Sequence, residues 1–565
     1  MAAGYTMVDH ANLGSLPATL GCRLAKCSSE MRTALALNVN TPSKLLEKRR
    51  TAVGALRKAA PTLDWDAKFK RAAAIESDIA AFFKRAQDSP KGSGSAAAAG
   101  QDLEGDAIGQ LSFQHWALKP LNHLPFMIAA LAIFKVWVVP CLAISTPLIA
   151  WILPYLLLKF VYALPIEQSQ YFKILRALWT GQMGAPLPAP GDPIPSLFST
   201  KSITQFLVFG ASFLQSIIQP IQNAIHLHNT DRVFLDLGAK LVELRGITRG
   251  FQADLARLGV QEYPLATTLD DLDSSDLRRG FILVTEEPGR LDLLLADLAR
   301  LEILWRLAAA ESLFHPAVFG SAEHFKLEGL ADLSLLSEGR PPPQTTDIAL
   351  SASAQPHAVV TGPNGGGKSS FLRAVLQAVL LAHTYGYVPA TAAEFPRLGW
   401  LASGLSLRDT PGVYSMFETE VKFAATCLKR VRSGSPGLVL FDELFHSTNP
   451  PDGTRTAERF LHALWTSGSG TSGSGDQQHP RHLFSIVSTH VFPLIEGAPP
   501  TVKAICCPAE ETEKGDINYK YRLEPGICRV SSVRKVWERF GLGAASSVRS
   551  KPAAERETAA TQDAQ

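Results

Sequence analysis

An excess of charge of either sign is missing from this sequence. Lysine and arginine together number 55 and aspartate and glutamate 52, which leaves a formal net charge of +3 over 565 residues. Such a balance gives no global signal for binding a polyanion. The basic excess is local and falls in residues 41–88. A local excess of this kind is more typical of a solvated helical face than of a nucleic-acid groove.

Cysteine is scarce, and its spacing excludes the common zinc-binding patterns. Seven cysteines are scattered through the chain, and neither the pair Cys22 and Cys27 nor the pair Cys506 and Cys507 has zinc-ligand spacing. Residues 1–20 also lack a cationic start followed by an apolar block, which a secretory leader requires. We therefore expect free thiols in a reducing compartment.

The length allows two to four domains with a sizeable core. Leucines at helical spacing, a Gly/Ser/Ala-rich stretch and a polar end divide the chain. The expected order is a helical N-terminal segment (1–88), a flexible linker (89–112), an apolar hairpin (120–168), a helical region resembling levers or a clamp (200–311), an α/β domain (312–542) and a disordered tail (543–565).

The apolar block at residues 125–166 contains only two charged side chains, Lys135 and Lys159. A helix needs about 20 apolar residues to cross a bilayer, so the block has room for two crossings with a turn at Ser145-Thr146-Pro147. An even number of crossings would leave both flanks on the cytosolic or nuclear side. The alternative is a buried helical hairpin in a soluble core, which the two lysines and four prolines keep open. Residues 203–225 are interrupted by glutamines and favour an amphipathic helix over a span.

A glycine-rich loop follows an apolar strand at residues 357–360 and precedes a helical stretch at 371–382. It fits the pattern G-x-x-x-x-G-K-[ST], in which backbone N–H groups and the lysine bind the phosphates of a nucleotide and the serine hydroxyl holds Mg²⁺. The expected ATP-binding residues are Gly362, Pro363, Asn364, Gly365, Gly366, Gly367, Lys368, Ser369 and Ser370, with Ser369 also a ligand of Mg²⁺.

Two further strands end in side chains suited to hydrolysis. The strand at 438–441 ends in Asp442, which we expect to hold Mg²⁺ through water, and Glu443, which we expect to polarise the attacking water. Another strand ends at Ser488-Thr489-His490. His490 has the bland interpretation of a core hydrogen bond, but beside the acidic pair we interpret it as a sensor of the γ-phosphate. Ser415 and Glu420 lie at an expected helix start, where they form an ordinary capping pattern.

Together these motifs resemble the MutS family of DNA mismatch-repair ATPases over residues 312–542. The matching segments are GPNGGGKSS for the family's GPN-x-GGKST, Val388-Pro389-Ala390 for V-P-A, Asp442-Glu443-Leu444 with Thr448 and Asp452-Gly453 for D-E-[IL]-G-R-G-T-x-x-x-D-G, and Ser488-Thr489-His490 for A-T-H. Transporter-type and chromosome-condensing ATPases carry an L-S-G-G-Q-like signature between the lysine and acidic motifs. This sequence instead has Ser415-Met416-Phe417-x-x-Glu420, which is similar to the S-T-F-x-x-E-M of the MutS group.

The resemblance implies a C-terminal α/β P-loop ATPase domain of the ABC type and an all-α lever and core region, which the apolar, transmembrane-like hairpin would interrupt. It also implies that Ser415 reaches the γ-phosphate bound to a second subunit, in a homodimer or a dimer of paralogues. The resemblance further implies that this dimer binds double-stranded DNA. The sequence departs from the family in three respects. Phe445-His446-Ser447 replaces G-R-G, no mismatch-wedge motif is present near the N-terminus, and the adenine-stacking residue is unassigned, with Phe325 and Phe319 as candidates.

Two functions are compatible with these motifs. One is a DNA-binding ATPase in which the basic stretch at residues 44–71 contacts DNA phosphates. Its basic residues include Lys48, Arg49, Arg50, Arg57 and Lys58. The other is a membrane-anchored ATPase whose helical arms act on a protein or on the bilayer. A nucleotide-binding scaffold without turnover is disfavoured, because Glu443 and His490 are needed only for hydrolysis.

Overall fold

The computed structural model falls into two compact units, which are described separately below. The first contains residues 1–65, 254–264 and 296–565, and the second contains residues 66–253 and 265–295. The residues that the structure describes are 7–88, 111–124, 126–163, 167–171, 200–260, 265–272, 274–336, 343–409, 412–432, 434–468, 482–512 and 516–540. The tail expected at 543–565 and nearly all of the linker expected at 89–112 lie outside these ranges.

A six-stranded sheet with the order β14-β11-β5-β10-β9-β8 forms the centre of the first unit. Its strands are β8 (Trp400–Gly404), β9 (Gly437–Phe441), β10 (Leu483–Ser488), β5 (His357–Thr361), β11 (Val502–Cys506) and the antiparallel edge strand β14 (Glu524–Pro525). The others pair in parallel. Strands β5, β8, β9 and β10 are buried at every position, which is typical of a parallel sheet covered on both faces.

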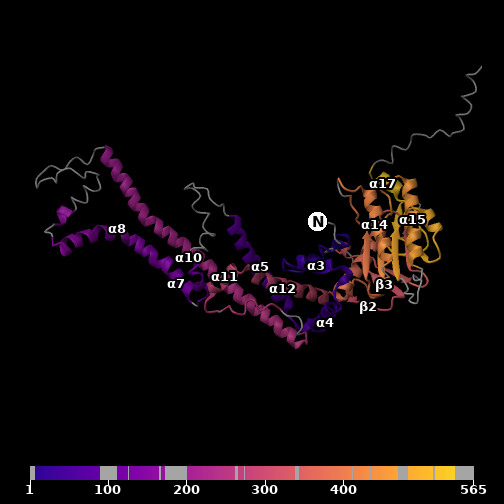
Figure 1. Ribbon diagram of the computed structural model, residues 1–565, viewed down its shortest axis with the longest axis horizontal. Helices are drawn as coiled ribbons and strands as arrows, with labels where there is room; N and C mark the ends of the chain where they lie inside the picture. The colour runs from indigo at the N-terminus through magenta and orange to yellow at the C-terminus, as the bar shows by residue number, and fades with distance from the viewer. Residues whose placement is uncertain are drawn as a thin grey trace, which may run out of the picture. The chain divides into compact units, whose positions relative to one another are not determined.

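Helices accompany this sheet in the first unit (Figure 1). The helices are α13 (Lys368–Tyr385), α14 (Met416–Val431), α15 (Pro450–Gly468), α16 (Phe492–Glu496) and α17 (Val533–Arg539). Side chains of α14 and α15 join those of β9 and β10 in one hydrophobic cluster that includes Phe441, Phe445 and Phe460.

A second sheet has the order β2-β7-β3-β4. Its strands are β2 (Val318–Phe319), β7 (Ala392–Phe395), β3 (His324–Leu330) and β4 (Thr346–Ser351). Two small pairs complete the strands: β1 (His315–Pro316) with β6 (Tyr387–Val388), and β12 (Ala509–Glu511) with β13 (Ile517–Tyr519). A short turn, η6 (Leu333–Leu335), follows β3. The described chain is therefore rich in helices and contains mixed sheets, which agrees in outline with the expected combination of α/β and all-α parts.

The N-terminal helices belong to the same unit and cover α13. They are α1 (Met7–His10), α2 (Leu16–Thr19), α3 (Cys27–Ala36), η1 (Asn38–Asn40), α4 (Ser43–Ala59) and η2 (Ala60–Thr62). Helices α3 and α4 and the turn η1 all contact α13. The Gln377 amide on α13 donates to the Ala11 carbonyl at 2.8 Å, so that a fully buried polar group on α13 is satisfied by the N-terminal segment.

The second unit is helical throughout its described part. Its elements are α5 (Trp65–Asp88), η3 (Lys119–His123), α7 (Met127–Ile133), η4 (Phe134–Val138), α8 (Val139–Leu156), η5 (Leu157–Val161), α10 (Thr200–Arg257), α11 (Leu277–Glu286) and the start of α12 (Pro288–Ala309). Phe82, Phe234 and Phe281 form its aromatic core, with ring centroids 4.8–6.3 Å apart.

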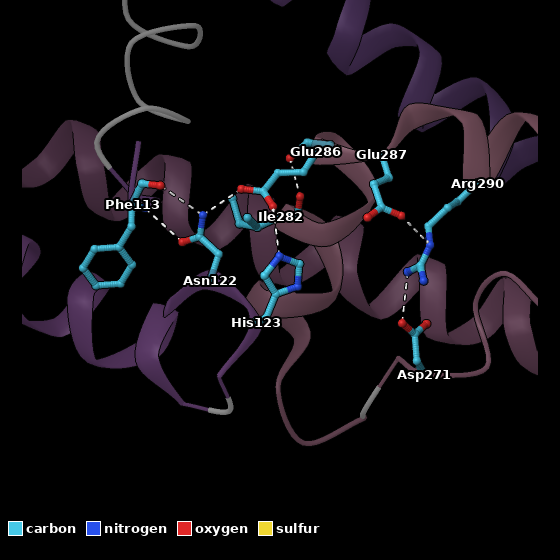
Figure 2. Close-up of polar contacts among 9 residues, drawn as sticks. Phe113, Asn122, His123, Asp271, Ile282, Glu286, Glu287 and Arg290 are labelled. Carbon is cyan, nitrogen blue, oxygen red and sulfur yellow. Dashed lines mark hydrogen bonds and ion pairs between the residues drawn. The ribbon is translucent and has the colours of Figure 1, made fainter. Parts of the chain in front are cut away.

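Buried polar contacts fix the base of the apolar helix in the second unit (Figure 2). The Asn122 amide donates to the Phe113 carbonyl at 3.1 Å and to Glu286 Oε1 at 2.7 Å, and its own oxygen accepts from the Phe113 N–H at 3.0 Å. His123 lies 3.8 Å from the same Glu286 carboxylate. These contacts join η3, which leads into α7, to the end of α11.

The apolar block is one helix, and the expected turn at Ser145-Thr146-Pro147 is wrong. Helix α8 runs through these residues, and the hydroxyls of Ser145 and Thr146 both donate to the Leu142 carbonyl, at 3.0 and 2.7 Å. The π-helical stretches η4 and η5 flank α8. Helix α8 thus continues through Pro147, and it is flanked by widened turns of the kind with which helices accommodate proline. Two membrane crossings within this block require that turn, so the prediction of two crossings is not supported either.

Candidate nucleotide site

The glycine-rich loop, residues 362–367, connects the end of β5 to the start of α13. Gly362, Gly365 and Gly367 have φ angles of +144°, +83° and +102°, which L side chains rarely adopt. A Cβ on Gly362 would lie only 2.7 Å from the Cys507 carbonyl oxygen. The loop thus requires glycine for both its turn and its packing. It leads into the N-terminus of an 18-residue helix, where unpaired backbone N–H groups and the helix dipole favour an anion.

A cavity of about 840 Å³ opens over this loop. Its floor is formed by Asn364 through Phe371, and Glu443 contributes to its lining. Asp332, Leu335 and residues 521–523 also line it. The volume lies within the ~300–1,000 Å³ that small-molecule and cofactor pockets usually have.

Lys368 is the central positive charge of the site. Its side chain is 4% exposed, and its ammonium donates to the carbonyls of Gly362 and Pro363 at 3.0 and 3.2 Å. Burial lowers the pKa of Lys368, whereas the nearby carboxylates of Glu443 and Asp442 raise it. A partly desolvated ammonium held beside backbone amides is suited to binding phosphate oxygens.

The acidic pair follows β9 and is clamped by Ser488 at the end of β10. The Ser488 hydroxyl donates to the Asp442 carboxylate, and the Glu443 N–H donates to the Ser488 hydroxyl and carbonyl oxygens at 3.1 and 3.2 Å. Because β9, β10 and β5 are parallel neighbours, their carboxyl ends meet at one edge of the sheet. This places the acidic pair beside the glycine-rich loop.

His490 links the loop to the acidic pair. Its Nε2 lies 2.9 Å from Asn364 Oδ1 and 3.3 Å from Glu443 Oε1. The hydrogen bond from His490 lowers the pKa of Glu443, in opposition to burial, which raises it. Glu443 is therefore held as a carboxylate, the form that can orient or deprotonate water.

Ser415 is the N-cap of α14, but its capping partner differs from the expected one. Its hydroxyl accepts from the Glu418 N–H at 3.2 Å, and the Glu418 carboxylate accepts from the Ser415 N–H at 2.8 Å, which completes a capping box. Glu420, which we expected in that role, is instead buried against Ser447. Ser415 does not line the cavity of its own chain.

The donors around the cavity fit Mg²⁺ and a nucleotide. In proteins Mg²⁺ is held by one or two carboxylates together with phosphate oxygens and water, rather than by a full protein cage. Asp442 supplies one carboxylate and Ser369 one hydroxyl beside the loop. No cluster of three or more His, Cys, Asp or Glu side chains able to hold a metal occurs in the described part of the chain.

The sequence did not predict that Tyr521 lines the cavity. The two residues that it offered for stacking on adenine, Phe325 and Phe319, lie elsewhere. Phe325 is fully buried and stacks on Phe395 at 5.3 Å, while Phe319 packs against His383 at 5.1 Å. Neither lines the cavity, whereas Tyr521 does. Tyr521 approaches the loop because β13 returns over it, with the Tyr519 hydroxyl donating to the Asn364 carbonyl at 3.3 Å. A contact between residues so far apart in the chain leaves no local signal.

Two arginines of the basic stretch at residues 44–71 make contacts inside the first unit. Arg49 donates to the Thr384 carbonyl at 2.9 Å and lies over the Tyr385 ring. Arg57 donates to the Phe314 carbonyl at 2.8 Å. Both guanidinium groups therefore serve the packing of α4 within its own unit. A DNA surface formed by Lys48, Arg50 and Lys58 stays a prediction.

Comparison with known proteins gives the same family over the C-terminal region. Residues 358–548 match the family model of MutS domain V. A DNA mismatch repair protein MutS of Thermus thermophilus is 33% identical over 185 residues, which are 33% of this chain and 21% of that protein. The mitochondrial DNA mismatch repair protein MSH1 of Arabidopsis thaliana is 31% identical over 225 residues, 39% of this chain and 18% of that protein. The chain thus spans about a fifth of the length of these relatives.

Proposed function

Since this chain belongs to the MutS family through its C-terminal region, we propose that it binds and hydrolyses ATP with Mg²⁺ and uses the cycle to control contact with double-stranded DNA. The proposal rests on one observation, the grouping of three sequence motifs at one place in the fold. The loop ending in Lys368-Ser369, the pair Asp442-Glu443 and His490 all lie at one edge of the parallel sheet, beside a cavity of about 840 Å³. This grouping supports the proposal of a P-loop ATPase of the ABC type.

Each residue has a role in this proposal. The loop amides and the Lys368 ammonium bind the β- and γ-phosphates. Ser369 and Asp442 hold Mg²⁺, which when bound neutralises charge on the phosphate oxygens. Glu443 orients the attacking water, and His490, already bonded to Glu443 and Asn364, contacts the γ-phosphate. Tyr521 lines the same cavity and would contact the base or ribose of the nucleotide.

A nucleotide titration tests the binding step. Lys368→Ala removes the ammonium that the loop carbonyls hold, so we expect ATP affinity to fall by about tenfold or more, the equivalent of ~1.4 kcal/mol. Lys429→Ala removes the same charge from an exposed position on α14 and serves as the matched control. Unchanged affinity in Lys368→Ala would contradict the assignment of the loop.

The dimer is the second part of the proposal. Ser415, at the N-terminus of α14 and away from the cavity of its own chain, contacts the γ-phosphate bound to a second subunit, identical or paralogous. ATP then favours the closed dimer because the γ-phosphate makes contacts there that the open dimer lacks. The helical parts of the chain convert closure into a change of DNA contact.

Binding to duplex DNA over a salt series tests the nucleic-acid part. Contacts to DNA phosphates release counterions, so log affinity falls linearly with log salt concentration. We expect this slope to be negative and to change between ATP and ADP. Absence of binding at low salt, or a flat response, would contradict a role on DNA.

A membrane-anchored ATPase acting on a protein or on the bilayer is a second candidate, which the apolar helix favours. Among the described residues, Met127–Thr146 is long and apolar enough to span a membrane, with mean hydropathy 2.3 and only 17% of the window buried. Exposed side chains in this window and in the rest of α8 include Trp137, Leu142, Ile149 and Leu153. Lys135 and Lys159 are 24 residues apart. That spacing is about 36 Å of helix, close to the ~30 Å hydrocarbon core of a bilayer.

Carbonate extraction of the expressed full chain separates the two candidates. We expect the wild type to stay with the membrane fraction, and Leu153→Glu to weaken this retention because it places a charge in the apolar stretch. Leu293→Glu, at an exposed leucine on α12, is the matched control. Complete release of the wild type would remove the membrane candidate and leave the DNA function unaffected.

A further inference from the structure

Glu420 is a buried carboxylate that the proposed hydrolysis does not use. It lies on α14 with 1% of its side chain exposed, and burial raises its pKa. Its carboxylate accepts a hydrogen bond from the Ser447 hydroxyl, and its Oε1 lies 3.5 Å from His446 Nδ1. A buried carboxylate is costly unless it is paired, so these contacts fix the position of the loop that carries Ser447.

That loop is the one that begins with Glu443. Glu443 and Phe445 both have a φ of +52°, in the left-handed region that side chains other than glycine rarely adopt. His446 Nδ1 also lies 2.8 Å from the Glu443 carbonyl oxygen. Residues 443–447 therefore form a tight turn of unfavourable backbone geometry, which persists only when surrounding contacts hold it.

Phe445 supplies the second contact between this turn and α14. Its side chain is 2% exposed, and its ring centroid lies 6.1 Å from that of Phe417 on α14 and 6.2 Å from that of Phe460 on α15. The turn is thus joined to α14 by an aromatic contact on one side and by the Glu420 carboxylate on the other. Helix α14 begins at Ser415, the residue assigned to the partner's nucleotide.

We propose that Glu420, Ser447 and Phe445 form a brace between α14 and the turn of residues 443–447, and that Glu420 is a positioning residue for Glu443. The inference rests on the proposed ATPase function. The brace holds the backbone of Glu443 so that its carboxylate meets His490. Any displacement of α14 on dimer closure reaches Glu443 through the brace, which couples contact with a partner subunit to hydrolysis within one chain.

The test removes one hydroxyl from the full-length chain. Ser447→Ala should lower kcat for ATP about tenfold or more, the equivalent of ~1.4 kcal/mol, with ATP Kd close to wild type. Because it leaves the buried Glu420 carboxylate without its hydroxyl donor, it should also lower Tm. Ser447 is exposed, so Ser447→Thr has room for its methyl group and should restore kcat by restoring the hydroxyl. Glu420→Gln combined with Ser447→Ala should add little to either single change, because both break one contact.

Thr426→Ala is the matched control, since its hydroxyl bonds only to Lys422 within α14, at 2.8 Å. It should keep wild-type kcat. Wild-type kcat in Ser447→Ala would overturn the brace, and so would a loss of kcat that Ser447→Thr fails to restore. A loss of ATP affinity as large as the loss of kcat would also overturn it, because the brace acts on Glu443 and not on nucleotide binding.

Amide hydrogen exchange separates failure of the brace from failure of the proposed function. Amides of residues 443–448 should exchange faster in Ser447→Ala than in wild type and in Thr426→Ala, whether or not the chain hydrolyses ATP. Absence of turnover in the wild type would refute the ATPase proposal alone. Unchanged exchange in Ser447→Ala would refute the brace alone.

Discussion

Phe445 provides the sharpest test of the unusual backbone at the site. Its φ of +52° lies in the left-handed region, yet its ring is buried among Phe417, Phe441 and Phe460. Two substitutions separate these properties. Phe445→Ala removes the ring and keeps the backbone strain, whereas Phe445→Gly removes both the ring and the strain.

The expected magnitudes follow from the burial and the φ angle. Loss of a buried phenylalanine ring costs about 3–5 kcal/mol of the free energy of unfolding in either variant. At an ordinary position glycine is a further ~0.5–1 kcal/mol less stable than alanine. Left-handed geometry costs alanine about 1–2 kcal/mol, which glycine avoids. Phe445→Gly should therefore be more stable than Phe445→Ala by about 0.5–1 kcal/mol, in the reverse of the usual order.

Amide exchange of the core strand β9 measures the free energy of opening for the first unit directly. Exchange should be about two- to fivefold slower in Phe445→Gly than in Phe445→Ala, since ~1.4 kcal/mol corresponds to a factor of ten. The control is Phe460 on the right-handed helix α15, where the alanine variant should be the more stable. If alanine is the more stable at both positions, the left-handed turn at Phe445 is refuted.

Three further results are expected. His490→Ala removes the hydrogen bond that lowers the pKa of Glu443, so this pKa should rise and the carboxylate should protonate at higher pH. The acid limb of the pH profile of kcat should therefore move to higher pH. An acid limb at the wild-type pH would count against the interaction of His490 with Glu443. Arg57→Ala leaves the Phe314 carbonyl without its donor and should lower the free energy of unfolding by ~1–3 kcal/mol. The slope of log DNA affinity against log salt concentration should not change. A slope smaller by about one unit would show that Arg57 contacts a DNA phosphate. Gly362→Ala places a Cβ 2.7 Å from the Cys507 carbonyl oxygen and should abolish ATP binding in a titration; wild-type affinity would show that the loop tolerates a side chain.

Local pattern was sufficient for the elements that carry the site. The apolar strand expected at residues 357–360 is β5, the one expected at 438–441 is β9, and the helix after the loop is α13. These strands are buried at every position, so a continuous apolar run identifies each one. Once the strands are parallel, the residues after their carboxyl ends must meet at one edge.

Tertiary contacts decided the rest, and no local pattern reports them. Arg49 and Arg57 have the composition of a solvated basic face, but each finds a carbonyl acceptor far along the chain. Prolines in the apolar block suggested a turn, yet helix α8 continues through Ser145, Thr146 and Pro147, with π-helical stretches on either side. Tyr521 reaches the cavity through strand pairing that its own neighbours do not specify.

ATP turnover by Glu443→Gln is the most direct test of the central claim that this cavity hydrolyses ATP. The substitution keeps the shape of the side chain but removes its charge and basicity. We expect ATP affinity to remain near that of the wild type and turnover to fall by about 10²-fold or more, the contribution usual for a general base. Turnover equal to that of the wild type would contradict the account.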